Sequence, residues 1–154
     1  MTAPAASSTA LHWLTFQLDD QAYAAPLAQV SEVIRMGEVT PVPGAAADLL
    51  GVRHLRGRVV PVLDGRRRLG LNPRDADGDS VRVVMLAHGA HWVGLRVDAV
   101  GELLLPGDAV AVPPPPGRAA RIEDPVTGVL PWKGGFVALL DVRRLCRLPE
   151  SDAA

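Results

Sequence analysis

The amino-acid sequence predicts an all-β fold built as two small β-barrels of five strands each, with short helices at matched positions. Three observations support this prediction. Short runs of alternating or β-branched apolar residues recur along the 154-residue chain. Gly, Pro and Asp separate these runs, as they do in turns. The third observation is an internal repeat, which indicates that one β module has been duplicated.

The repeat is clearest between residues 51–64 and residues 128–141. Each copy begins with Gly-Val, turns at a basic residue followed by glycine, and ends in an apolar run that an aspartate closes. The basic turn residue is Arg56 in one copy and Lys133 in the other. Further upstream, the matched pairs are Leu14 with Val84, Phe16 with Leu86, Val30 with Val100, Glu32 with Glu102, Val33 with Leu103, and Val42 with Val112. The alternative is chance similarity between two β-rich segments, but matched Gly, Asp and Arg positions are harder to obtain by chance than matched valines.

Residues 1–10 are rich in Ala, Ser and Thr and are predicted to form a disordered tail. The alternation in residues 12–18 predicts a half-buried strand, and residues 22–25 return after a turn. Residues 27–34 fit either one or two helical turns or a turn followed by a strand, and the sequence leaves both open.

Residues 37–43 are predicted to be extended because of their prolines, and residues 45–50 to form a single helical turn. Residues 51–64 then supply two strands around the Arg56 turn. Asp64 is placed to cap a short helix over residues 66–69, which Gly70 closes.

The second half repeats this order, and the polar residues 72–80 are the predicted boundary between the copies. The predicted elements are strands at 81–86, 91–97 and 100–105, an extended segment at 109–112, a polyproline stretch at 113–116, a polar loop at 117–125, the second Gly-Val unit and a helix at 141–148. We therefore predict a first barrel over residues 11–78, a second over residues 79–148 and a tail at 149–154, with residues 11–148 forming one domain.

Composition and charge exclude several classes of function. Hydrophobic residues make up 48% of the chain, enough for a sizeable core, and aromatics only 4%, so Val, Leu and Ala should fill it. The formal net charge of −1 argues against a nucleic-acid partner. No run approaches the ~18 apolar residues that span a bilayer, and residues 1–10 lack the charge of a secretory signal. We expect a cytoplasmic protein without membrane insertion.

Catalytic and metal-binding motifs are weak. Cys146 is the single cysteine, with no histidine near it in sequence, and is expected to be a small core residue in a reducing compartment. His88 and His91 flank a turn without the further ligands that zinc requires. No serine lies in a nucleophile elbow, and no phosphate-binding loop is present. Of the three arginine side chains at residues 66–68, one or two should point to water. We expect no catalysis, metal or cofactor, and a binding module remains.

A set of motifs in fixed order, spanning residues 13–148, resembles the CheW family of bacterial chemotaxis coupling proteins. The motifs are Phe16-x-Leu18, Val30-x-Glu32-Val33-Ile34, Pro43, Gly51-Val52-x-x-Leu55-Arg56-Gly57-x-Val59-Val60-Pro61-Val62-x-Asp64, Val93-Gly94-Leu95-x-Val97-Asp98-x-Val100, Gly128-Val129 and Leu140-Asp141. Departures from the family pattern are His54, Gly65, four consecutive prolines and a missing tyrosine before the second Gly-Val.

The resemblance implies two five-stranded barrels of SH3-like type and a non-catalytic adaptor. Family members couple the cytoplasmic tip of chemoreceptors to a CheA-type histidine kinase, whose regulatory domain has the same fold, in membrane-associated receptor arrays. The departures point to an alternative role in a non-flagellar chemosensory system for pilus motility or surface sensing. By resemblance, the residues tied to receptor or kinase coupling are Val30, Glu32, Gly51 and Arg56, and those of a groove on the second barrel are Val93, Gly94, Val100 and Leu103.

Arg56 is the strongest single candidate. At a glycine-flanked turn its side chain should project, and a guanidinium can hold a carboxylate or carbonyls of a partner. The other hypothesis is an ion pair within the chain, with Glu32 as the candidate partner. Both remain open at this stage.

Overall fold

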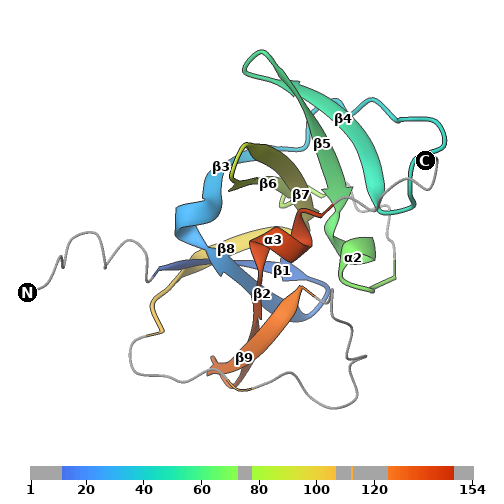
Figure 1. Ribbon diagram of the computed structural model, residues 1–154. Helices are drawn as coiled ribbons and strands as arrows, with labels where there is room; N and C mark the ends of the chain where they lie inside the picture. Colours follow the sequence, from blue (N-terminus) through green and yellow to red (C-terminus); the bar gives the residue numbers. More distant parts are fainter. Residues whose placement is uncertain (1–11, 73–77, 107–111, 113–124, 148–154) are drawn as a thin grey trace, which may run out of the picture.

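The computed structural model describes residues 12–72, 78–106, 112 and 125–147 (Figure 1). Ten strands form two five-stranded sheets, which confirms the all-β prediction. Sheet A has the strand order β8 (Ala99–Leu104), β1 (Trp13–Leu18), β2 (Gln21–Pro26), β10 (Gly135–Leu140), β9 (Val126–Trp132). Sheet B has the order β3 (Val30–Arg35), β6 (Arg82–His88), β7 (His91–Val97), β5 (Arg58–Asp64), β4 (Leu49–Leu55). The helical elements are η1 (Leu27–Gln29), α2 (Gly65–Arg68) and α3 (Val142–Leu145).

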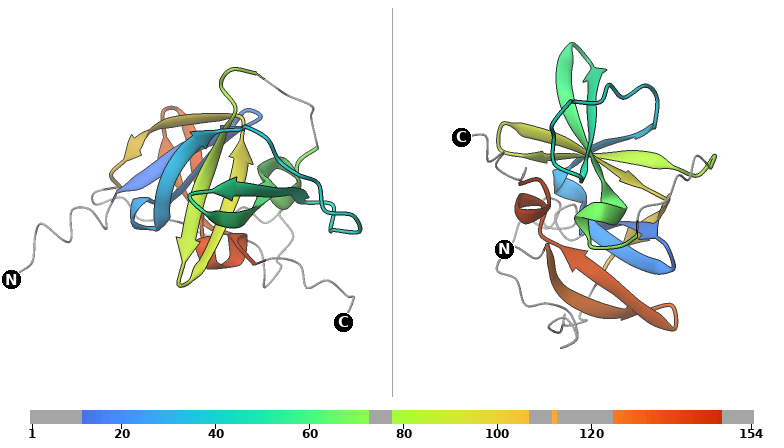
Figure 2. Two further views of the ribbon diagram at one scale, coloured as in Figure 1. Left: turned by 90° about the horizontal axis from the view of Figure 1, so that it is seen from above. Right: turned by 90° about the vertical axis from the view of Figure 1, so that its right-hand side faces the viewer.

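The two copies of the repeat exchange their first hairpins. The hairpin β1–β2 of the first copy pairs with β8 and β10 of the second, and β6–β7 of the second copy pairs with β3 and β5 of the first. Figure 2 shows the blue N-terminal hairpin beside the orange-red C-terminal strands. The predicted division into a barrel at residues 11–78 and another at 79–148 is therefore wrong, because each sheet takes strands from both halves.

The exchange keeps the internal symmetry. Each hairpin joins its new sheet through a parallel pair of strands, β2 with β10 and β7 with β5. In one pair Leu139 lies opposite Ala24, and in the other Val62 lies opposite Gly94. These are the positions that the sequence repeat matches, so the same register occurs in both sheets.

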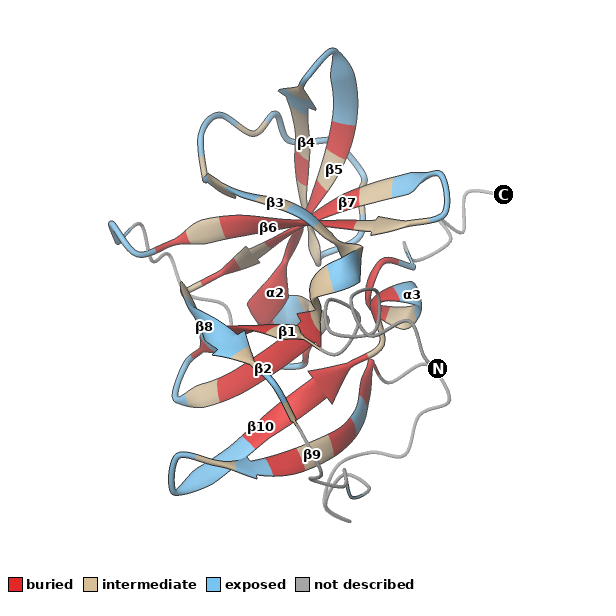
Figure 3. Cartoon of the chain, turned by 90° about the vertical axis from the view of Figure 1, so that its left-hand side faces the viewer, coloured by how far each residue is buried: buried red, intermediate tan, exposed pale blue. Residues whose placement is uncertain are grey.

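The core explains why several strands are apolar along their whole length. Successive side chains of a strand point to opposite faces. In β6, Val83 and Met85 pack inside sheet B, whereas Val84 and Leu86 point into a core shared with sheet A. Both faces of β6 are buried (Figure 3), so the strand lacks the polar alternation of a half-exposed one.

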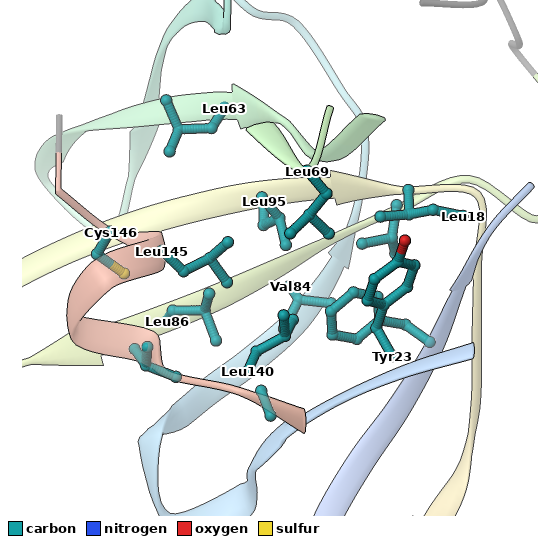
Figure 4. Close-up of a cluster of buried hydrophobic side chains, with 14 of the residues drawn as sticks. Leu18, Tyr23, Leu63, Leu69, Val84, Leu86, Leu95, Leu140, Leu145 and Cys146 are labelled. Carbon is teal, nitrogen blue, oxygen red and sulfur yellow. The ribbon is translucent and has the colours of Figure 1, made fainter. Parts of the chain in front are cut away.

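The shared core joins the ends of the chain. Figure 4 shows Leu18 and Tyr23 from the first hairpin in the same cluster as Leu140, Leu145 and Cys146 from the C-terminal segment. Sheet A has a second, smaller cluster of its own, made of Ala22, Ala24, Leu130, Val137 and Leu139. Each sheet thus surrounds a small interior and packs its other face on the shared core.

Turns and caps are as the sequence predicts. Arg56 and Lys133 have φ values of 53° and 48°, and the glycines after them are also in the left-handed region. Two consecutive positive φ angles define the hairpin turn that fits the twist of paired strands. Asp64 accepts a hydrogen bond from the Arg66 amide at 3.1 Å and caps α2. Its repeat partner Asp141 caps α3 by accepting a hydrogen bond from the Arg144 amide at 3.2 Å.

One open local prediction is settled and another is corrected. Residues 27–34 form η1 followed by β3, the turn-and-strand alternative. The helical turn predicted at residues 45–50 is absent: two separate turns close there, from Val42 to Ala45 and from Ala46 to Leu49, because β4 already begins at Leu49. The terminal tails, the loop at 117–124 and the predicted polyproline stretch lie outside the described residues. Within the described part of the chain, no helix is long and apolar enough to cross a membrane.

Of the three arginines predicted to point partly to water, Arg67 is exposed and Arg66 is buried. The Arg66 guanidinium donates from Nε and Nη2 to the two carboxylate oxygens of Asp98, at 3.0 and 2.5 Å, and from Nη1 to Asp19 at 2.5 Å. The hydrogen bond with Asp98 raises the pKa of Arg66 above its ordinary value. Asp19 lies in the β1–β2 turn of sheet A, so Arg66 connects α2, which follows sheet B, to the other sheet.

Candidate functional site

Two open edge strands provide the main candidate surface for a partner. β3 pairs only with β6 and β8 only with β1 among the described strands, and each is the end strand of its sheet. Figure 1 shows β3 and β8 on the side of the molecule away from α2. We call this the edge surface and define it by its exposed or half-buried residues, which are Val30, Glu32, Val33, Arg56, Val100, Glu102, Leu103 and Leu105.

The apolar part of the edge surface is unusually exposed. Leu103 is 51% exposed, Leu105 56% and Val33 38%. Val30 and Val100 are half-buried and pack against the shared core from the two edge strands. Apolar side chains along an unpaired strand edge are typical of a surface that another protein covers.

Glu32 and Arg56 form an ion pair on this surface. Arg56 Nε lies 2.8 Å from Glu32 Oε2 and Nη2 lies 3.2 Å from Oε1, a two-point contact. The hydrogen bond from Arg56 lowers the pKa of Glu32 and raises that of Arg56. The Arg56 side chain is nevertheless 67% exposed, so both hypotheses from the sequence hold in part: the residue projects and it is also paired.

The second copy of the repeat carries an equivalent pair. Lys133 Nζ contacts Glu102 Oε1, and both side chains are more than half exposed. These residues match Arg56 and Glu32 in the sequence repeat. The sequence repeat matches Arg56 with Lys133 and Glu32 with Glu102. Only the fold shows that the basic residue and the glutamate of each copy contact each other.

Three of the residues assigned by resemblance lie inside the protein. Val93 is 3% exposed and Gly94 is buried in β7. A Cβ atom on Gly94 would lie 2.7 Å from Val83 Cγ1, and one on Gly51 would lie 2.3 Å from the carbonyl oxygen of Thr40. Gly51 and Gly94 thus leave room for atoms packed against the strands. Val93 and Gly94 belong to sheet B, and Val100 and Leu103 to sheet A, so the four do not form one groove on one barrel.

Among the described residues, no group of three or more His, Cys, Asp or Glu side chains could hold a metal ion. His88 and His91 flank the β6–β7 turn, as the sequence suggested. Cys146 belongs to the shared core and is 8% exposed, which confirms its expected place as a core residue.

Burial raises the pKa of the Cys146 thiol to about 12. Because the thiolate is the reactive form, native protein at pH 8 should react with a thiol reagent roughly a thousandfold more slowly than unfolded protein. Stopped-flow labelling with and without guanidinium measures this ratio. Similar rates would show that Cys146 is accessible.

The pKa of Cys146 also affects stability. In the unfolded chain the thiol loses its proton near pH 9.0, whereas the folded protein keeps it until about pH 12. The free energy of unfolding therefore falls as the pH rises from 9.0 towards 12.

Comparisons with known proteins agree with the geometry. A family model described as a CheW-like domain matches residues 12–150. The chain is 30% identical to the probable chemotaxis protein CheW of Rhizobium etli over 92% of this chain and 90% of that protein. It is 32% identical to protein FrzA of Myxococcus xanthus, over 80% and 76% of the two chains. The crystal structure of the scaffolding protein TtCheW from Thermoanaerobacter tengcongensis superposes with a TM-score of 0.75 at 25% identity, covering 84% of this chain and 88% of that one.

Proposed function

The chain belongs to the family of CheW-like domains, and from this premise we propose that it is a non-catalytic scaffold that couples chemoreceptors to a CheA-type histidine kinase. The observation that carries the proposal is the family match over residues 12–150, nearly the whole chain. The relatives from Rhizobium are named as chemotaxis proteins, and the structural neighbour is described as a scaffolding protein.

The edge surface supports the same function. An adaptor needs accessible contacts for other proteins rather than an enclosed pocket for a substrate. Two open strand edges, each with an ion pair and exposed apolar side chains beside it, supply two similar contact regions on one small molecule. We propose the tip of a chemoreceptor and the regulatory domain of the kinase as the two partners, and a cytoplasmic location with recruitment to receptor arrays.

The proposal is tested by pull-down from cells of the source organism with the tagged full-length chain. Recovery of both a chemoreceptor and a CheA-type kinase is the expected result, and recovery of neither would contradict it.

One observation favours a second candidate, a scaffold in a non-flagellar chemosensory system: the 32% identical relative FrzA has a different name from the CheW proteins. The identity of the recovered receptor distinguishes the two.

Arg56→Ala should weaken partner binding without unfolding the protein. Glu32 uses the Nε hydrogen and one Nη2 hydrogen, so the remaining donors of the guanidinium are available to a partner. Loss of a central arginine contact should reduce affinity by about tenfold or more. Calorimetric titration with the purified kinase domain and a receptor fragment measures the change.

Lys133→Ala is the matched variant for the second contact region, because it removes the equivalent cation of the other copy. The melting temperature should stay within about 2 °C of the original for both variants, since exposed ion pairs stabilise proteins little. Folded Arg56→Ala protein with unchanged affinity for both partners would place the contact elsewhere. Loss of folding would instead show that the ion pair is structural.

A further inference from the structure

The short helix α2 directly follows β5 of sheet B, yet two of its side chains contact elements of sheet A. Arg66 reaches the β1–β2 turn, where its Nη1 lies 2.5 Å from a carboxylate oxygen of Asp19. Arg68 donates to the carbonyl oxygens of Arg144 and Leu145, at 2.5 and 3.1 Å. These carbonyls lie in α3, which follows β10 of sheet A. One helix thus contacts both the first hairpin and the last helix of the other sheet.

Asp98 connects the Arg66 contact to the crossover between the sheets. It is the single residue between β7 of sheet B and β8 of sheet A. Its Oδ2 accepts hydrogen bonds from Arg66 Nη2 at 2.5 Å and from the Asp19 amide at 2.7 Å. Its own amide donates to the Gln17 carbonyl oxygen at 3.0 Å. The Arg66 side chain is 5% exposed, so water competes little for these bonds, and helix, turn and crossover form one polar cluster.

The two sheets also share an apolar core, but the two kinds of contact constrain them differently. Burial of apolar surface has no preferred direction. A guanidinium, by contrast, binds its acceptors in a planar fork with fixed directions. A small rotation of one sheet against the other would keep most of the apolar surface buried but would lengthen the bonds of Arg66 and Arg68. The polar contacts should therefore restrict the angle between the sheets.

The second copy of the sequence repeat does not carry these contacts. The matched residues are Arg66 with Arg143, Asp19 with Gly89, Asp98 with Ala28, and Arg68 with Leu145. An arginine is kept in the first pair, but glycine and alanine replace its two carboxylate partners, and the last pair replaces a guanidinium by an apolar side chain. α3 therefore cannot hold the β6–β7 hairpin as α2 holds the β1–β2 hairpin. This polar connection is one-sided in an otherwise symmetric fold.

We propose that α2, through Arg66 and Arg68, is a joint that sets the angle between the two sheets and thereby the spacing of the edge strands β3 and β8. β3 belongs to sheet B and β8 to sheet A, so a rotation between the sheets moves one edge relative to the other. β8 begins at the residue after Asp98. For a partner that contacts both edges, a consequence that rests on the proposed function, the joint fixes the docking geometry. The angle itself depends on no partner.

Residual dipolar couplings of the backbone amides of the full chain measure this angle, because each coupling depends on the direction of its N–H bond in a common alignment. In the original protein, the couplings of both sheets should fit one alignment tensor. In Arg66→Met, which keeps a long side chain but no donor, each sheet should still fit a tensor of its own. The two tensors should differ by roughly 10°, the scale of rigid-body rotations between packed units.

Asp19→Gly is the milder variant. Asp19 has a φ of 55°, and the matched turn residue Gly89 has a φ of 61°, so glycine suits this turn. The substitution removes one acceptor, keeps the contact between Arg66 and Asp98, and should cause a smaller rotation in the same direction. It decides the question if Arg66→Met does not fold. An unfolded Asp19→Gly protein would show that the contact is needed for folding itself and would contradict a role in the angle.

Asp20→Ala and Arg143→Met are the matched controls. The first removes a carboxylate from the same turn, and the second removes the arginine of α3 that corresponds to Arg66. Both should keep the original angle. The same angle in Arg66→Met and Asp19→Gly would show that the shared core alone sets it and would overturn the proposal. A rotation in the controls as large as in those variants would assign the effect to net charge and would overturn it as well.

Discussion

Val60→Asp is expected to abolish folding. Val60 is 2% exposed and packs with Val62, Val83 and Met85 inside sheet B. A carboxylate there would lose its hydration, and the described structure offers no buried cation in this cluster. The cost is several kcal/mol, a large part of the ~5–15 kcal/mol that stabilises a typical domain. Circular dichroism and soluble yield after expression measure the effect.

The neighbouring residue provides the control. Val59 precedes Val60 in β5 and points to the opposite face, where it is 58% exposed. Val59→Asp introduces the same charge one position away and should leave the protein folded. A soluble Val60→Asp protein with an unchanged melting temperature would show that the orientation of β5 is wrong.

A fragment of residues 79–154 alone is expected to be unfolded. It contains β6 to β10, but these strands belong to two different sheets. Without the first half, β6–β7 loses β3 and β5, and β9–β10 loses β2. What remains is two separate hairpins and a single strand, and an isolated hairpin is at most marginally stable. Dispersion of amide NMR signals and a thermal melt test this.

The same fragment mixed with residues 1–78 should recover structure. The complementary fragment supplies β1 to β5, the partners that both hairpins need. The expected result is a cooperative transition that appears only in the mixture and depends on concentration. Cooperative melting of residues 79–154 alone, at the temperature of the whole chain, would contradict the hairpin exchange.

The sequence predicted only in part which of the candidate site residues lie at the surface. Glu32 and Arg56 reach the surface, as polarity and turn geometry predict, and Leu103 reaches it from an edge strand although it is apolar. Gly51, Val93 and Gly94 do not, because a sequence motif does not distinguish a residue that contacts a partner from one that packs inside the sheet. For the arginine run, the sequence predicted that only part of it points to water, but not which side chain is buried. Arg66 is charged yet buried, since two aspartates distant in sequence receive its guanidinium.

The sequence by itself determined the strands, the tight turns at Arg56 and Lys133, the caps at Asp64 and Asp141, and the duplication. These depend on neighbouring residues and on spacing along the chain, which a sequence displays directly. Only the tertiary structure decided which hairpin joins which sheet. The two copies offer nearly the same edges and the same register, so local pattern cannot choose between pairing within a copy and pairing across copies. The choice depends on contacts between residues far apart in the chain, which bury both faces of each central strand in one shared core.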